Sequence, residues 1–440
     1  MQKKKKEELP PIFNTSFLSI AIADKIYKIN YSRKKNPYKG FEQVDYKLTR
    51  FNNVPRLLSI PHPKSYIDLC FVLAENWAQY SSIESNAQSL IKPKIHKDGR
   101  VIIMDYELSS VKMKRTIDMF FGKRFIVHAD ISNFYPSIYS HAIPWALIDI
   151  KAAKKDTNTS KWFNKIDMKQ RNIKRNETLG VAIGPATSNI VAEIILSKID
   201  EKLKNDFEYV RFIDDYTCYC ETQEKADDFI RKLAEYLNEY KLNLNYKKTY
   251  IDPLPVQVNS DWINDLNTHL PYGDEYEYQQ VINYLDYALE LQKKHKDGSV
   301  LKYAIKTILP KCNYEAKEYL LDYTQSLSYF YPVLIPILST ILDELNSFFS
   351  YYHMEKILEQ SIINKQSDGI CWMLYAFKNH SVSVSDDVAR KIIETKDCMS
   401  ITTLYLFDEH KSKVVDFVST LDKEDLYQLD TYWILIYQLF

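Results

Sequence analysis

Three aspartates, Asp130, Asp214 and Asp215, are the side chains of this sequence best suited to chemistry. Asp214 and Asp215 lie between two runs rich in aromatic and β-branched residues, 207–213 and 216–220, a pattern typical of a β-hairpin. Hairpin tips usually carry Asn-Gly or Asp-Gly, and two adjacent carboxylates repel each other unless a cation lies between them. Asp130 ends another short apolar run that begins at residue 124. These carboxylates therefore indicate a site for divalent cations.

Nucleotidyl transfer is the chemistry that such a site could support. A hydroxyl attacks an α-phosphate in line, and two Mg²⁺ ions about 3.5–4 Å apart neutralise the attacking and leaving oxygens. Carboxylates and substrate phosphates hold these ions, and Mn²⁺ can replace them. The backbone carbonyl of Ile131 would add another oxygen ligand. The prediction fails if Asp130 lies too far from Asp214 and Asp215 to share an ion with them.

The elements that must position the aspartates fall between residues 124 and 250. The pattern predicts first a strand over 124–131, a helix over 137–155 and a loop over 151–178. A helix that opens at Gly184-Pro185 follows, and then the two strands of the hairpin. A helix capped by Thr222 and a strand over 241–249 complete the order. This is an antiparallel α+β module with helices on one face of the sheet. Upstream, residues 66–80 read as a helix and residues 90–125 as a basic arm containing strands.

The sequence changes character at about residue 260, where segments of helical periodicity follow one another with short connections. They are 276–294, 299–309, 314–330, 332–350, 353–363, 368–379, 384–395, 399–406 and 410–418. Successive helix pairs of this length predict an all-α helical-repeat or bundle domain. The apolar segment 433–440 is expected either to dock onto this domain or to be buried by a partner.

Four motifs in this order resemble the palm of reverse transcriptases, over roughly residues 60–255. Residues 130–138 resemble motif A, Gly180 to Ser188 motif B, 212–215 the YxDD box of motif C, and 242–249 motif D. The resemblance implies a reverse-transcriptase-like α+β fold, with fingers and a palm made of an antiparallel sheet and packed helices. The predicted domains are an N-terminal extension with basic fingers (1–125), the palm with the catalytic carboxylates (126–258) and the helical-repeat domain (259–440).

Residues 134–145 and the helical tail most resemble the abortive-infection (defence-associated) bacterial reverse transcriptases, such as AbiK and AbiA. That resemblance implies a helical-repeat domain in place of a thumb and a homo-oligomer. It also implies anti-phage defence by DNA synthesis from dNTPs, without a conventional template and primed on protein, so that single-stranded DNA becomes attached to the chain.

Residue roles follow from the same resemblance. Asp130, Asp214 and Asp215 match the metal ligands, and Tyr135 matches the bulky residue that excludes a 2′-hydroxyl. Lys248 matches a candidate acid near the departing pyrophosphate. Gly184, Pro185 and Ser188 match the turn beside the base pair, and Lys112 and Arg115, ahead of Arg100, are the candidates for triphosphate contacts in the fingers.

Two positions depart from the reverse transcriptase pattern. Phe212 replaces the tyrosine of the YxDD box, and Ala182-Ile183 stands where templated enzymes usually place Pro-Gln before the glycine. That glutamine-bearing loop touches the template-side base pair, so its absence weakens the case for faithful copying. The carboxylates are intact, which argues for catalysis.

Composition and charge distribution indicate the class of partner and the cellular compartment. Basic side chains outnumber acidic ones in residues 1–130, including clusters at 3–6 and 33–35, and acidic ones dominate after residue 260. A polyanion is therefore expected to bind the N-terminal part of the chain. No apolar run approaches the roughly 20 residues of a membrane span, no secretory signal opens the chain, and the six cysteines show no zinc spacing. These features favour a reducing cytoplasm and no membrane partner.

Three other hypotheses stay open. A retron- or intron-type enzyme would copy an RNA template, and a catalytically silent scaffold would act through its helical domain alone. A ribonuclease toxin would need an arginine–histidine dyad, and only Arg56 and His62, in a proline-punctuated loop, have a suitable spacing.

Overall fold

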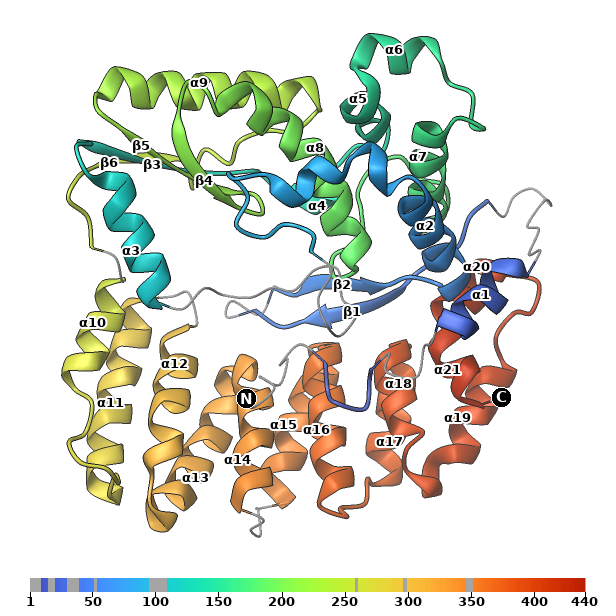
Figure 1. The fold of residues 1–440 in the computed structure, drawn as a ribbon. Helices are drawn as coiled ribbons and strands as arrows, with labels where there is room; N and C mark the ends of the chain where they lie inside the picture. The colour runs from blue at the N-terminus through green and yellow to red at the C-terminus, as the bar shows by residue number, and fades with distance from the viewer. Residues whose placement is uncertain are drawn as a thin grey trace. The chain divides into compact units, whose positions relative to one another are not determined.

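The computed structural model describes residues 9–14, 20–29, 39–50, 54–94, 109–257, 260–295, 299–345 and 351–439 (Figure 1). The chain divides into two compact units. The sheet unit comprises Ile20–Gln43 and Ser59–Val258, and the helical unit comprises Met1–Ser19, Val44–Leu58 and Asn259–Phe440. Residues 44–58, which the sequence prediction grouped with the fingers, thus belong to the helical unit. The division of the sheet unit into fingers and palm stays a prediction.

A four-stranded antiparallel sheet carries the aspartates. Its order is β4 (Glu208–Phe212), β5 (Asp215–Cys220), β3 (Phe125–Asp130) and β6 (Tyr250–Pro253). On β5 the alternating side chains of Tyr216, Cys218 and Cys220 are fully buried, as period-2 patterning predicts for a strand with one face on the core. The predicted hairpin and the predicted strand before Asp130 are confirmed.

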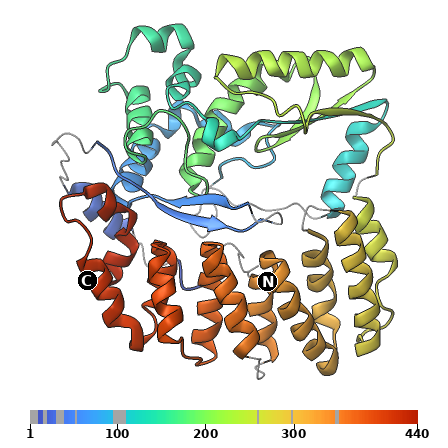
Figure 2. The same cartoon turned by 180° about the vertical axis from the view of Figure 1, so that it is seen from behind.

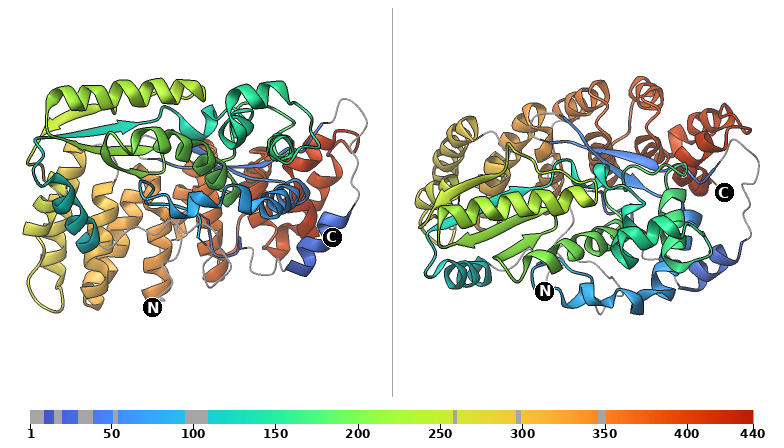
Figure 3. Two further views of the ribbon diagram at one scale, coloured as in Figure 1. Left: turned by 45° about the horizontal axis from the view of Figure 1, so that its top comes forward. Right: turned by 90° about the horizontal axis from the view of Figure 1, so that it is seen from above.

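Two long helices, α8 (Ala186–Leu203) and α9 (Gln223–Glu239), pack beside each other, and α9 runs across β3 and β5 (Figure 3). The Thr222 hydroxyl accepts a hydrogen bond from the backbone N–H of Lys225, 3.2 Å away, which confirms the predicted cap. Phe229, Leu233 and Leu237 lie on the buried face of α9. Each contributes about 1.5–3 kcal/mol by leaving water, so this stripe fixes α9 on the sheet.

Two segments of the sheet unit differ from the prediction. The single helix predicted over 137–155 is two short helices, α5 (Ala142–Ile148) and α6 (Ile150–Lys155), and α4 (Phe134–Ser137) ends where the predicted helix begins. Asp149 separates α5 from α6, because it adopts a positive φ of 88° and starts a new helix by accepting the backbone N–H of Lys151. The predicted loop 151–178 contains α7 (Trp162–Asn172), which packs on α2 (Pro63–Glu75).

The predicted strand 241–249 is also wrong. Within this stretch only Leu244 pairs as a bridge, with Ile131, and the strand itself is β6, which begins at Tyr250. Lys241 adopts a positive φ of 65°, which breaks the extended backbone at its start. The basic arm predicted over 90–125 ends in a helix, α3 (Ser109–Phe120), and residues 95–108 of that arm lie outside the described residues. The short helix α1 (Ile20–Lys28) packs on α2 in the same unit.

The helical unit is a succession of short-linked helices (Figure 2). All nine predicted segments are helical where described: α11 (Tyr278–Lys294), α12 (Ser299–Ile308), α13 (Tyr314–Phe330), α14 (Ile335–Leu345), α15 (Tyr351–Ile363), α16 (Ser367–Asn379), α17 (Asp386–Glu394), α18 (Cys398–Leu404) and α19 (Lys411–Ser419). Three helices were not predicted, α10 (Asp261–Thr268), α20 (Leu426–Thr431) and α21 (Trp433–Leu439). Helix α21 packs on α18, so the apolar segment docks within its own unit.

An N-terminal strand belongs to the same unit. Strand β1 (Val44–Leu48), which pairs with β2 (Arg56–Ile60), packs on α16 and α18. The hydroxyl and backbone N–H of Thr49 donate to the Asp368 carboxylate at 2.6 and 2.7 Å. Across the described part of the chain, no helix is both long and apolar enough to span a bilayer.

Candidate active site

Asp130 and Asp215 face each other across neighbouring strands. They are direct partners in the β3–β5 ladder, and such partners have Cβ atoms about 4.5–5.5 Å apart. Asp214 precedes Asp215 in the turn, where its carbonyl accepts the backbone N–H of Ile131 at 3.3 Å. The three aspartates that the sequence singled out therefore meet at one end of the sheet, and the condition that would have overturned the prediction is not met.

The hairpin tip differs by one residue from the prediction. Phe212 pairs with Asp215, so the two linking residues are Ile213 and Asp214 rather than Asp214 and Asp215. Ile213 has a positive φ of 58°, which a β-branched residue rarely adopts and which costs on the order of 1–3 kcal/mol. A turn of this kind must be held by its surroundings.

The electrostatics around Asp215 favour a bound cation. Burial, followed by the charge of Asp214 and the hydrogen bond and charge of Asp130, raises the pKa of Asp215 to about 7, against the lowering effect of Lys248. The carboxylates repel one another, so a proton or another cation is needed between them. Oxygen donors of this kind suit Mg²⁺, so the chemistry of the donor set matches that ion.

Two side chains from the 241–249 stretch hold Asp130. The Lys248 ammonium lies 2.9 Å from Oδ2, and the Asn245 side-chain amide donates to Oδ1 at 2.9 Å. The hydrogen bond to Asp130 raises the pKa of Lys248. Asn245 also donates its backbone N–H to the Asp130 carbonyl at 2.7 Å. Lys248 was predicted from its motif, whereas Asn245 was missed because a turn residue has no periodic signal.

The described residues contain no group of three histidine, cysteine or acidic side chains arranged to hold one metal ion. The Lys248 ammonium and the Asn245 amide each contact one oxygen of Asp130.

A buried arginine fixes the turn from behind. Arg211 on β4 is fully buried, and its guanidinium contacts Glu193 at 2.8 Å and Asp200 at 2.7 Å, both on α8. The same guanidinium donates to the Ile213 carbonyl at 2.8 Å. Burial alone would lower the pKa of Arg211, but the charges of Asp200 and Glu193 raise it well above its ordinary value. We call Arg211, Glu193 and Asp200 the arginine clamp; sequence analysis did not predict it.

Further polar groups complete the clamp. The Tyr209 hydroxyl and the Asn86 amide donate to Asp200 at 2.8 and 2.7 Å. The backbone of Arg211 pairs with the segment 88–90, through hydrogen bonds of 2.7 Å to the Gln88 carbonyl and 2.8 Å from the Leu90 N–H. Asp200 is thus fully hydrogen-bonded, as a buried carboxylate must be.

Comparison with known families bears directly on this arrangement. Residues 82–259 match the family model described as reverse transcriptase (RNA-dependent DNA polymerase). This part of the chain, less than half of its length, is similar to a reverse transcriptase domain. The three aspartates, the hairpin and the clamp all lie inside the matched residues.

Solved telomerase structures resemble the chain at low sequence identity. Apo telomerase from Candida tropicalis, truncated from its C-terminal domain, is 12% identical with a TM-score of 0.34, and the match covers 52% of each chain. Apo telomerase from the same organism is 10% identical over 88% of this chain and 70% of that one, with a TM-score of 0.37. Telomerase from Candida albicans, in complex with a fragment of telomeric RNA, is 12% identical over 91% and 68%, with a TM-score of 0.34. The chain spans about half the length of the first of these. No curated protein sequence matches it.

The turn before α8 places the residues that resemble motif B of reverse transcriptases. Gly184 has a φ of 123°, and Pro185 caps the helix with extended backbone. A Cβ at Gly184 would lie 3.8 Å from the Ser59 carbonyl, so the backbone angle, rather than space, requires glycine there. Gly184 is exposed, Pro185 is half-buried and Ser188 is buried. The roles of these residues beside a base pair stay predictions.

Tyr135 and the predicted triphosphate contacts occupy different surroundings. Tyr135 is buried, and its hydroxyl donates to the side-chain oxygen of Asn189 on α8. Lys112 is exposed on α3, and Arg115 lies within electrostatic range of Tyr219. Tyr219 is four residues along β5 from Asp215, and the roles of Lys112 and Arg115 as triphosphate contacts stay predictions. Arg100 and the basic clusters at 3–6 and 33–35 lie outside the described residues.

Proposed function

We propose that the protein is an anti-phage DNA polymerase of reverse transcriptase type that adds dNTPs without a conventional template and primes on its own chain. The observation that carries the catalytic part is the direct pairing of Asp130 with Asp215, beside Asp214, in the part of the chain that is similar to a reverse transcriptase domain. The loss of Pro-Gln before Gly184 and the helical unit after residue 259 support the untemplated, defence-associated part. Six unpaired cysteines agree with a reducing cytoplasm.

Two divalent cations would neutralise the charge that develops on the attacking and leaving oxygens. Asp130, Asp214 and Asp215 would hold them, with the Ile131 carbonyl as a further oxygen. Asp215 must first lose the proton that its neighbours favour. Lys248, whose pKa is raised by its hydrogen bond to Asp130, is protonated at neutral pH and would donate a proton to the departing pyrophosphate. Tyr135, anchored through Asn189, would present its ring against the sugar and refuse a 2′-hydroxyl.

One experiment tests the proposal directly. The purified protein is incubated with Mg²⁺ and each labelled dNTP separately, without template, and label attached to the protein is measured on denaturing gels. We expect attachment with wild-type protein and none with Asp215→Asn. Asp252→Asn is the matched control, because Asp252 lies on the same sheet but pairs with Ile126, away from the tip. Free DNA in place of protein-bound label would refute protein priming.

An RNA template separates the proposal from retron- or intron-type copying. We expect the product composition to be unchanged when a defined RNA is added, and a product that follows the RNA sequence would replace our proposal with templated synthesis. Full phage defence by Asp215→Asn would instead favour a scaffold that acts through the helical unit.

The ribonuclease alternative gains no support from His62. Its Nδ1 accepts the backbone N–H of Lys64 at 3.3 Å as the cap of α2, and its ring stacks on Phe41 with centroids 4.5 Å apart. A histidine engaged in capping and stacking is already accounted for by the fold.

A further inference from the structure

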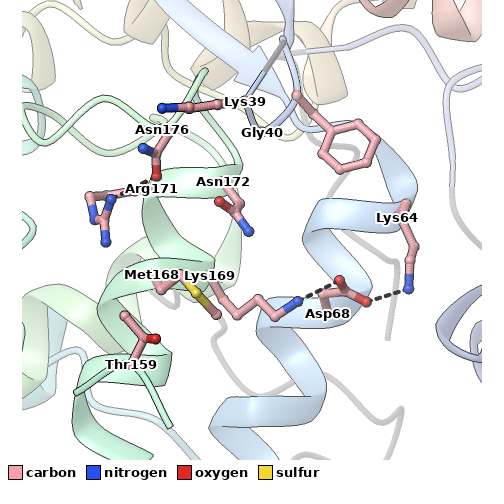
Figure 4. A pocket seen from close by; sticks show the side chains of 11 residues that line it. Lys39, Gly40, Lys64, Asp68, Thr159, Met168, Lys169, Arg171, Asn172 and Asn176 are labelled. Atoms are coloured by element: carbon pink, nitrogen blue, oxygen red, sulfur yellow. Dashed lines mark hydrogen bonds and ion pairs between the residues drawn. The ribbon is translucent and has the colours of Figure 1, made fainter. Parts of the chain in front are cut away.

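A cavity of about 430 Å³ lies between α2 and α7 of the sheet unit, formed by elements other than the strands that carry the aspartates (Figure 4). We call it the α2–α7 pocket. Its lining includes Lys39, Lys64, Asp68, Lys169, Arg171 and Asn172. Four of these six side chains are cationic and one is acidic. This imbalance is what a ligand would have to satisfy.

Two lysines share the one carboxylate of the wall. Lys64 and Lys169 reach Asp68 from α2 and α7, at 2.7 and 2.8 Å (Figure 4). Their side chains are only 13% and 21% exposed, and Asp68 is 13% exposed. Lys64 also donates to the Tyr27 carbonyl at 2.9 Å. Two ammonium groups beside one carboxylate, largely out of water, have a net positive charge that a bound anion would offset.

A further acid beside the pocket is already paired with other groups. Asp167 lies behind Arg171, with the Arg171 Nε 3.3 Å from its Oδ1, and it also contacts His141 at 2.7 Å. The C-terminal end of α7 contributes about half a negative charge through the helix dipole. Lys64, Lys169 and Arg171 against these two carboxylates and this partial charge leave this part of the wall weakly positive.

The pocket also offers hydrogen-bond donors. Arg171 donates from Nη1 to the Asn176 side-chain oxygen at 2.6 Å, so the NH₂ group of that side chain points away from Arg171 and can act as a donor. Within the described part of the chain, the Asn172 side chain makes no hydrogen bond, although its backbone carbonyl accepts the Phe41 N–H at 2.8 Å. Ammonium, guanidinium and amide donors around one cavity match the oxygens of a phosphate group.

We propose that the α2–α7 pocket binds a phosphate group, carried either by a free nucleotide or by a nucleic-acid strand. The alternative is that Lys64, Asp68 and Lys169 only tie α2 to α7. The two hypotheses predict different effects of a substitution at Asn172, because this residue borders the pocket but takes no part in the contact between α2 and α7. They also predict different effects of a substitution at Lys165, which lies one turn before Lys169 and pairs with Glu75 on α2 at 3.8 Å, outside the pocket.

The test measures binding by the full-length chain in EDTA, so that it does not depend on catalysis. The probes are a fluorescent single-stranded dT10, dTTP and inorganic phosphate. Asn172→Asp adds a carboxylate without disturbing the tie, and Lys169→Glu reverses a pocket charge. Lys165→Glu is the matched control on the same helix, and thermal melts establish that each variant is folded.

We expect Asn172→Asp and Lys169→Glu to raise the Kd of at least one probe fivefold or more, while Lys165→Glu changes it less than twofold. If affinity is lost for dT10 alone, and the slope of log K against log salt concentration becomes smaller by about 0.7 per phosphate contact, the pocket binds a nucleic-acid strand. Loss for dTTP and phosphate as well assigns it to a free phosphate compound. Unchanged binding by Asn172→Asp, or equal loss in Lys165→Glu and Lys169→Glu, would overturn the proposal.

Discussion

Replacement of Arg211 by methionine tests how the catalytic turn is held. Methionine keeps most of the side-chain length and removes the charge from the arginine clamp. Glu193 and Asp200 are only 3% and 2% exposed, so both carboxylates then remain buried without a counter-charge. Asp200 retains Tyr209 and Asn86, whereas the described residues give Glu193 no other hydrogen-bonding side chain.

The expected loss of stability is large. Removing one partner of a buried ion pair costs about 3–5 kcal/mol. The Ile213 carbonyl also loses the donor that lies 2.8 Å away, which adds about 1 kcal/mol. We therefore expect a loss of about 4–6 kcal/mol in the free energy of unfolding. For a unit of this size, the melting temperature falls about 2–4 °C per kcal/mol, hence by roughly 10–20 °C.

Urea unfolding and thermal melts provide the measurement, with Arg231→Met as the matched control. Arg231 is 66% exposed and pairs with Asp228 on the surface of α9, so the same change there should cost less than about 0.5 kcal/mol. The triple variant Glu193→Gln, Asp200→Asn, Arg211→Met removes the buried charges and should recover about half of the loss. If Arg211→Met destabilises the protein by no more than Arg231→Met does, the clamp does not exist as described.

Three further outcomes follow from the site. Asp215→Asn should abolish nucleotide incorporation, measured with labelled dNTPs, while thermal melts stay within a few degrees of wild type; a collapse of stability would make Asp215 structural. Tyr135→Val should increase ribonucleotide incorporation relative to dNTPs at least tenfold in the same assay, and an unchanged ratio would remove Tyr135 from sugar selection. In EDTA, the folded state binds more protons than the unfolded one between about pH 4 and 7, because burial, Asp214 and Asp130 raise the pKa of Asp215. The free energy of unfolding should therefore fall as pH rises through this window, and urea titrations should show a smaller fall for Asp215→Asn; equal slopes would refute the shift.

The elements that sequence patterns predicted are those whose signals are local. Helix α9 has a capping threonine and an apolar stripe at helical spacing, and both read directly from the residues. Helix α7 was missed because Asn164, Asp167 and Gln170, which are polar, occupy its buried face and interrupt the stripe. The stretch before β6 alternates as a strand would, but its residues serve as a turn that holds Asp130 through Asn245 and Lys248.

The arginine clamp was not predicted, although the sequence contains a signal for each of its parts. Tyr209 and Arg211 are two residues apart on β4, so a buried Tyr209 requires that Arg211 also faces the core. On α8, Glu193 and Asp200 are seven residues apart and share one face with isoleucines and leucines. A charge on the inner face of a strand and two acids on the apolar face of a helix can each be read from the sequence, but their pairing depends on the tertiary packing of the two elements. Because a buried arginine is stable only with such partners, an inward-facing charge near a catalytic turn predicts opposite charges on the element that covers it.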